Sequence, residues 1–236
     1  FVKINSEKMS KSLGNIFPVK EILKKYHPEV LRLFMLQSHY RSPVDYSEES
    51  LVEARTSLIR GYRALQLLKE LQDQSTAKTG KDGGKNAGDK AEDYINKFEK
   101  LKAKFDEAMD DDFNTAQALG HVFDMVRMIN NFGVEEKNMS TSDKVRILAA
   151  ARNVFDHFGS VLGVFHGDAD QFFVDDQKTE LKKRDLNVAD IENMVRQRQL
   201  ARENKDWTRA DEIRKALAKL NIVLKDSAGG TRWMVE

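Results

Sequence analysis

The sequence predicts a mainly α-helical protein, in which a bundle of long antiparallel helices precedes a small α/β module. Two observations lead to this prediction. Apolar residues recur at helical spacing through four long segments between residues 47 and 161. Nearer the end of the chain, two further helical segments are followed by two short apolar runs on either side of a Ser-Ala-Gly-Gly turn.

The composition indicates a folded protein and excludes several kinds of site. The 236 residues are 40% apolar, and 39 basic residues balance 38 acidic ones, so any nucleic-acid surface has to be a local patch. There is no cysteine, and the five histidines lack the spacing of metal ligands, so we expect no metal site. No apolar run reaches the roughly 18 residues of a membrane span. We expect a monomeric, cytoplasmic protein that does not bind membranes.

The first 46 residues are expected to complete a domain. "FVKIN" alternates apolar and polar side chains as an edge strand does, entered partway through a domain. We therefore expect the chain to be the C-terminal part of a longer protein. The loop "KMSKSLGN" follows at residues 8–15, and Pro28 then begins a helix predicted over 28–38.

The central part of the chain predicts the helix bundle. Its four helices are expected over 47–71, 91–109, 114–132 and 142–161. Ser47 begins a capping pattern at the first of them. Residues 73–90 are rich in Gly, Lys and Asp and indicate a mobile surface loop. The run Asp110–Asp112 could form a metal or acid–base cluster. Carboxylates just before a helix, however, accept hydrogen bonds from its first backbone amides, so we expect these residues to cap the helix.

The last part of the chain predicts a linker and a small module. Residues 163–187 lack a clear period and end in a run of charges, which indicates a linker. Residues 188–203 and 206–220 have the pattern of a helical hairpin, and "IVLKD" and "TRWMVE" that of two short strands.

The loop at residues 8–15 is the clearest candidate for chemistry. Lys8 and Lys11 lie three residues apart among serines and a glycine, so both ammonium groups can reach one polyanion, of which phosphate is the obvious example. A lone pair of lysines would more often be a solvated basic turn. The eight specified positions favour the functional interpretation.

The string "KMSKS" matches the signature loop of class I aminoacyl-tRNA synthetases. In that family the loop closes over ATP, and its lysines stabilise the triphosphate and the departing pyrophosphate. The resemblance implies that Lys8 and Lys11 are catalytic. It also implies an ATP-binding loop made of Lys8, Met9, Ser10, Lys11 and Ser12.

Three longer stretches resemble cysteinyl-tRNA synthetase. They are residues 28–51, 107–119 and 201–233, in the order of that family. The resemblance implies that residues 1–46 end a catalytic domain with a stem-contact region, that 47–162 form a DALR-type helical bundle (with Val30-Leu31-Arg32 as the DALR-like sequence), and that 188–236 bind the anticodon. Cysteine tRNA, ATP and cysteine are the implied partners. The HIGH sequence and the zinc ligands of the family would lie outside this chain, so we expect the chain alone to be inactive.

The predicted anticodon module has its own candidate residues. Between residues 192 and 219 there are eight basic and five acidic side chains, a local charge of +3. Trp207 follows a predicted N-cap, Asp206, where a tryptophan could be buried or could stack on an unpaired base. The resemblance favours stacking, because Arg202, Trp207, Asp211 and Asp226 match positions that contact anticodon bases.

Other interpretations remain open at this stage. A related ligase joins cysteine to an amino sugar and shares the lysine loop, but it would not need the tail. A tRNA-binding module without a catalytic role is the other alternative. The group His39-Tyr40-Arg41 has no nucleophile beside it, and we expect Tyr40 and Arg41 to support the loop or meet the acceptor stem.

Overall fold

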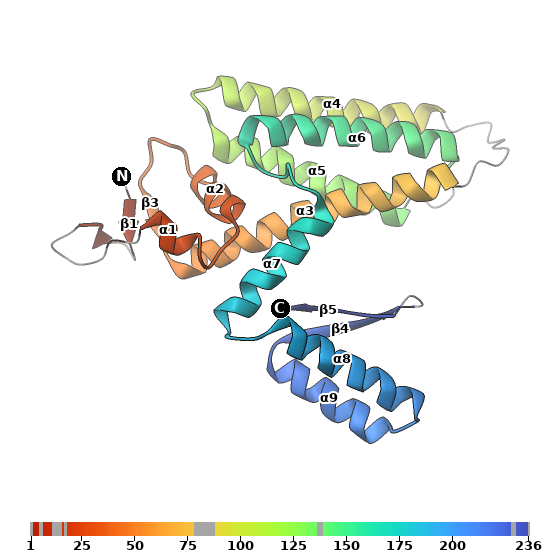
Figure 1. Ribbon diagram of the computed structural model, residues 1–236. Helices are drawn as coiled ribbons and strands as arrows, with labels where there is room; N and C mark the ends of the chain where they lie inside the picture. The colour runs from red at the N-terminus through yellow and green to blue at the C-terminus, as the bar shows by residue number, and fades with distance from the viewer. Residues whose placement is uncertain are drawn as a thin grey trace. The chain divides into compact units, whose positions relative to one another are not determined.

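Helices make up most of the computed structural model, which describes residues 2–4, 7–10, 16, 18–77, 88–135, 139–227 and 230–235 (Figure 1). The mainly helical architecture expected from the sequence is thereby confirmed. The chain divides into two compact units. The first comprises residues 1–18 and 28–172, and the second residues 19–27 and 173–236.

The first unit begins with a small three-stranded sheet in the order β2-β1-β3. Strand β1 (Val2–Ile4) pairs antiparallel with β2 (Glu7–Lys8) and parallel with β3 (Val44–Tyr46). The expectation of an edge strand at "FVKIN" is therefore wrong, because β1 has a partner on each side. Helix α2 (Pro28–Leu36) begins at the proline that the sequence analysis singled out.

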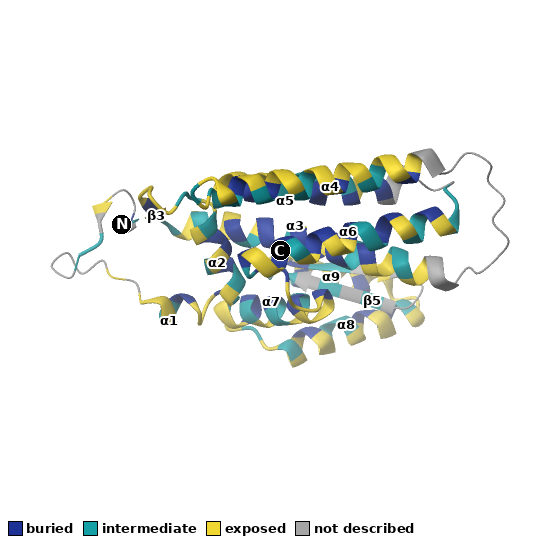
Figure 2. Ribbon diagram, turned by 90° about the horizontal axis from the view of Figure 1, so that it is seen from above, coloured by how far each residue is buried: buried dark blue, intermediate teal, exposed yellow. Residues whose placement is uncertain are grey.

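Four long helices form the bundle of the first unit. They are α3 (Glu48–Ala77), α4 (Gly88–Asp110), α5 (Thr115–Glu135) and α6 (Thr141–Leu162). Helices α3 and α4 each pack against both α5 and α6. The buried residues lie along one side of each helix, as the dark segments of Figure 2 show. The largest fully buried side chains of the bundle are Tyr62, Phe98, Phe105, Phe155 and Phe158.

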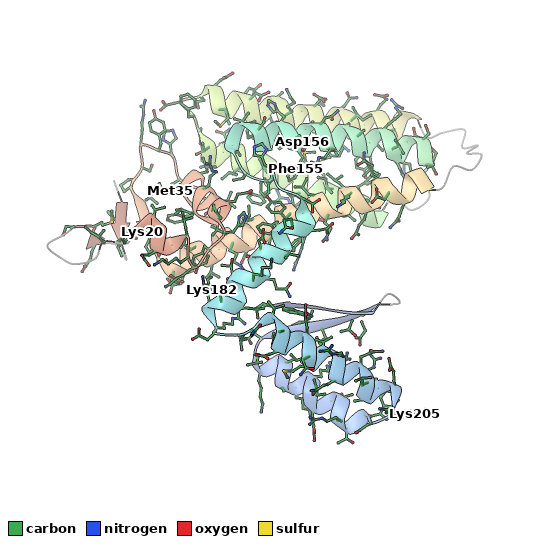
Figure 3. The ribbon with its side chains drawn as sticks, in the orientation of Figure 1. Lys20, Met35, Phe155, Asp156, Lys182 and Lys205 are labelled. Atoms are coloured by element: carbon green, nitrogen blue, oxygen red, sulfur yellow. The ribbon has the colours of Figure 1, made fainter. Side chains whose placement is uncertain are left out.

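Local capping explains where α3 and α6 begin and where α6 ends. The Ser47 hydroxyl accepts from the Ser50 amide at 3.1 Å, and the Ser50 hydroxyl accepts in return from the Ser47 amide at 3.2 Å. At α6, Ser140 caps the first turn, and Gly163 ends the helix in the left-handed conformation, with a φ of 68°. Figure 3 shows two successive residues of α6, Phe155, which is buried, and Asp156, which is exposed.

Two expectations about the bundle need correction. The predicted loop 73–90 is shorter, because α3 continues to Ala77 and α4 already begins at Gly88. Residues 78–87 lie outside the described part of the chain. The aspartates also do not cap the third helix of the bundle, since Asp110 still belongs to α4 and Asn114 accepts from the Gln117 amide at 3.1 Å.

A buried network fixes the chain after α6. The Tyr62 hydroxyl donates to Glu29 Oε1 at 2.9 Å, and Glu29 Oε2 accepts from the Phe165 amide at 2.7 Å. Burial and the neighbouring Glu29 carboxylate raise the pKa of Tyr62 well above its usual value. At Gly61 a β-carbon would lie 2.2 Å from the Phe165 ring, so only glycine allows this approach in the middle of α3.

The second unit holds a helical hairpin and a strand pair. Its elements are α1 (Val19–Ile22), most of α7 (Ala169–Lys183), α8 (Val188–Glu203), α9 (Trp207–Lys219), β4 (Ile222–Ser227) and β5 (Gly230–Val235). The hairpin and both strands are as expected. Residues 163–187, in which the sequence shows no clear period, are mostly helical, because α7 occupies most of that stretch; their role as a linker stays a prediction. The core of the unit consists of Leu181, Ile191, Ile213, Leu217 and Ile222.

Candidate functional site

The lysine loop is anchored at its start by the small sheet. Lys8 is the last residue of β2 and is paired with Lys3 of β1. Met9 and Ser10 follow the strand, and both are half-buried. Lys11 and Ser12, the other expected members of the ATP-binding loop, lie outside the described residues. The described part of the loop is therefore its attachment to the sheet.

A polar cluster joins the turn after α2 to the turn between α4 and α5. The Tyr40 hydroxyl donates to Asp112 Oδ1 at 2.7 Å, and Arg41 Nη2 donates to the same oxygen at 2.9 Å. Arg41 Nε also donates to the Tyr40 oxygen at 3.0 Å, and His39 Nε2 lies 3.8 Å from Asp112 Oδ2. The hydrogen bond to Tyr40 and the charge of Asp112 raise the pKa of Arg41.

The same turn presents an aromatic side chain to solvent. Asp112 and Phe113 both have a φ of 54°, in the left-handed region that such residues seldom occupy. The Phe113 side chain is 65% exposed and lines a hollow of about 550 Å³ together with Tyr40 and Met35. Sequence reasoning expected Tyr40 and Arg41 to support the loop or meet RNA, but it did not connect them with Asp112, because 71 residues separate Asp112 from Arg41.

In the second unit, the two tryptophans have opposite environments. Trp207 is the first residue of α9 and is 61% exposed, whereas Trp233 of β5 is half-buried against the core. The predicted N-cap is confirmed, since Asp206 Oδ1 accepts from the Arg209 amide at 3.0 Å. Lys205 lies in the turn before it, with a φ of 59° (Figure 3). The buried alternative for Trp207 is therefore excluded.

Asp226 and Arg202, two of the expected RNA-binding residues, are hydrogen-bonded to each other, and a third residue, Arg198, also binds Asp226. Arg198 Nη1 donates to Asp226 Oδ1 at 3.0 Å and its Nη2 to Oδ2 at 2.9 Å. Arg202 Nη1 donates to the same Oδ2 at 2.9 Å, and the Thr231 hydroxyl to Oδ1 at 2.7 Å. These donors, Arg198 first, hold the pKa of Asp226 well below its usual range.

Asp211, the remaining expected RNA-binding residue, is exposed on α9. Its charge contributes to the raised pKa of Arg198, after the hydrogen bond and charge of Asp226. Sequence reasoning did not single out Arg198 beyond the basic count of the segment. The sequence offered little indication of its role, because a buried arginine of α8 cannot be distinguished in the sequence from the exposed arginines near it.

Neither a metal centre nor a membrane span is found in the parts of the chain that the structure describes. Within these ranges no group of three or more His, Cys, Asp or Glu side chains is placed to hold a metal ion. Over the same residues, every helix is too short or too polar to cross a bilayer.

Comparisons with known proteins identify three successive domains. Residues 1–56 match the family model of the tRNA synthetases class I (C) catalytic domain, residues 104–166 that of the DALR domain, and residues 184–233 that of the Cysteinyl-tRNA ligase anticodon binding domain. The domain limits expected from the sequence stay a prediction, since the DALR match begins inside α4.

The chain is also similar to curated proteins over its whole length. It is 44% identical to the cysteine–tRNA ligase of Geobacter sulfurreducens and 42% identical to that of Geotalea uraniireducens, in each case over 100% of this chain. It covers 46% and 48% of these proteins, so it spans about half the length of the curated relatives it matches. These matches confirm the resemblance inferred from the motifs.

Proposed function

Because the chain belongs to the cysteine–tRNA ligase family, we propose that it supplies the ATP loop and the tRNA-binding domains of an enzyme that joins cysteine to its tRNA. The observation that carries this proposal is the similarity over the whole chain, including the stretch that matches an anticodon-binding domain. An anticodon domain also favours tRNA over an amino sugar as the acceptor of cysteine. The ligation serves protein synthesis, so we place it in the cytoplasm.

The lysine loop would act through electrostatics. Lys8 and Lys11 would hold the triphosphate of ATP and neutralise the charge that develops on the departing pyrophosphate. Met9, Ser10 and Ser12 would shape the loop around the nucleotide. The pairing of β2 with β1 supports this role, because a lysine at a strand end starts from a fixed backbone position.

The residues that the structure describes do not fit zinc, which the family implies. The chain contains no cysteine, and its described part holds no cluster of metal-ligating side chains. The residues present serve nucleotide and RNA binding.

The second unit would read the anticodon. The exposed indole of Trp207 offers a stacking surface for an unpaired base, and Arg202 with Asp226 offers a donor beside an acceptor. Asp211 would add a second acceptor from the adjacent helix. Phosphates of the RNA would be held by exposed lysines such as Lys205.

Direct binding of RNA tests the proposal. A transcript of cysteine tRNA is titrated with the 236-residue chain, and fluorescence anisotropy gives the Kd at one fixed salt concentration. We expect binding at least about ten-fold tighter than for a transcript in which the anticodon alone is replaced. Equal affinity for both transcripts would contradict an anticodon-reading role for the second unit.

A further inference from the structure

Arg198 occupies a position from which it can act on RNA only through another residue. Its side chain is 10% exposed, on the buried face of α8, and both terminal nitrogens are bonded to Asp226. A two-pronged contact of this kind sets the plane of the carboxylate as well as its distance. Arg198 therefore determines how Asp226 is oriented toward solvent.

The carboxylate of Asp226 has no acceptor site left over. Its Oδ1 accepts from Arg198 and Thr231, and its Oδ2 accepts from Arg198 and Arg202. An ionised carboxylate offers about four lone-pair sites, which these four hydrogen bonds occupy. An amino group of a base can therefore bond to Asp226 only by replacing one of the present donors.

Arg202 is the donor best suited to leave. It makes one hydrogen bond to the carboxylate and its side chain is 38% exposed, so water or RNA can replace that bond at small free-energy cost. Displacing Arg198 from Asp226 would instead leave the guanidinium of Arg198, whose side chain is 10% exposed, buried without its partner. Once Arg202 is released, its guanidinium remains next to the carboxylate as a donor beside an acceptor. That pair suits the Watson–Crick edge of an unpaired base.

We propose that Arg198 is a positioning residue, which holds Asp226 in place while Arg202 exchanges its contact with Asp226 for a base of the RNA. The inference rests on the proposed function, because it requires the second unit to read the anticodon. Its ligand is a base edge that carries a donor and an acceptor side by side. Arg198 itself does not touch the RNA.

The test compares discrimination rather than affinity alone. The parent chain, Arg198→Gln and Arg198→Lys are titrated with cysteine tRNA and with three transcripts that each carry one anticodon substitution. For each substituted transcript, discrimination is the ratio of its Kd to the Kd of cysteine tRNA. Arg198→Gln is expected to lower the largest of these three ratios at least about five-fold. Arg198→Lys keeps the charge but cannot form the planar two-pronged contact, so we expect a smaller loss. The matched control is Arg196→Gln, which removes the same charge from an exposed position of α8 and is expected to leave the ratio unchanged.

A double-mutant cycle shows whether Arg198 acts through Asp226. In an Asp226→Asn background, Arg198→Gln is expected to cause no further loss of discrimination, because the residue it orients has already been changed. An equal loss in both backgrounds would overturn the proposal. If melting curves show that Arg198→Gln does not fold, Arg198→Lys decides, and an unchanged Kd ratio in that variant would overturn the proposal as well.

The design also separates this inference from the proposed function. A parent chain that binds all four transcripts equally would contradict the anticodon role itself. A parent that discriminates, and loses discrimination with Asp226→Asn but not with either Arg198 variant, would contradict only the positioning role. Retained discrimination with Arg202→Gln would show that Arg202 makes no exchange with a base.

Discussion

The two tryptophans of the chain show how one residue type takes different roles within one small module. The spacing of the sequence alone is compatible with a buried or an exposed Trp207, because a side chain in the first turn of a helix can point toward the core or toward solvent. The structure leaves it 61% exposed, while Trp233 packs on the cluster around Leu217 and Ile222. Sequence could therefore name the candidate, but only packing could decide its environment.

Replacing Trp207 by alanine is expected to weaken RNA binding and to spare the fold. Loss of a stacking surface should cost about 1–3 kcal/mol of binding free energy for cysteine tRNA, while the melting curve stays close to that of the parent. The matched change is Trp233→Ala, expected to lower the unfolding free energy by about 2–4 kcal/mol because that ring is partly buried. Unchanged affinity in a folded Trp207→Ala would remove the residue from the RNA surface.

The low pKa of Asp226 makes the second unit sensitive to acid. A carboxylate whose pKa is lowered on folding stabilises the protein above its unfolded pKa of about 3.9, and this contribution is lost as the pH falls below that value. The difference in unfolding free energy between the parent and Asp226→Asn should therefore shrink on going from about pH 6 to about pH 3. This difference is measured by tryptophan fluorescence in urea titrations, since both tryptophans lie in this unit. A difference that is constant with pH would contradict the paired state of Asp226.

Sequence patterns predicted the positions of most helices well and failed where polar residues are buried. The segment of α7 lacks a clear apolar period and therefore predicts a linker; the structure shows that two of its buried positions are the polar residues Asp176 and Glu180, which are 6% and 7% exposed. Lys183 donates to Glu180 at 2.7 Å and so compensates one of these charges. The capping signal at Asp168, which accepts from the amides of Asp170 and Gln171, was available in the sequence.

The start of α5 offers a direct test of capping. Asn114 accepts from the Gln117 amide, so Asn114→Ala should lower the unfolding free energy by about 1 kcal/mol. Asp111→Ala, at an exposed position three residues earlier, should change it by less than about 0.5 kcal/mol. Thermal melts of both variants against the parent measure the difference. A larger loss for Asp111→Ala would restore the aspartates as the cap.

For the chain as a whole, the functional interpretation depended on the order of its segments. The lysine loop, the helix bundle and the basic tail follow one another as in the three matched domains, and sequence reasoning could recognise that order. The contacts that join distant residues could not be predicted in this way, because no local pattern marks them. Asp112 with Arg41 and Asp226 with Arg198 are examples, each dependent on how segments far apart in the sequence pack together.

The entire chain should bind RNA without catalysing the adenylation of cysteine. Under the proposed function, binding of tRNA depends on the second unit, whose candidate residues are all among the described ones, whereas adenylation requires a complete pocket for ATP and cysteine. Because the chain spans about half the length of its curated relatives, we expect the 236-residue chain to bind cysteine tRNA and to show no cysteine-dependent exchange of pyrophosphate into ATP. Both are measured on one preparation, and a full-length relative such as the Geobacter sulfurreducens ligase is the positive control. Exchange above background by this chain would show that its own residues form a working adenylation site, and the role assigned to Lys8 and Lys11 would then have to include binding of the amino acid.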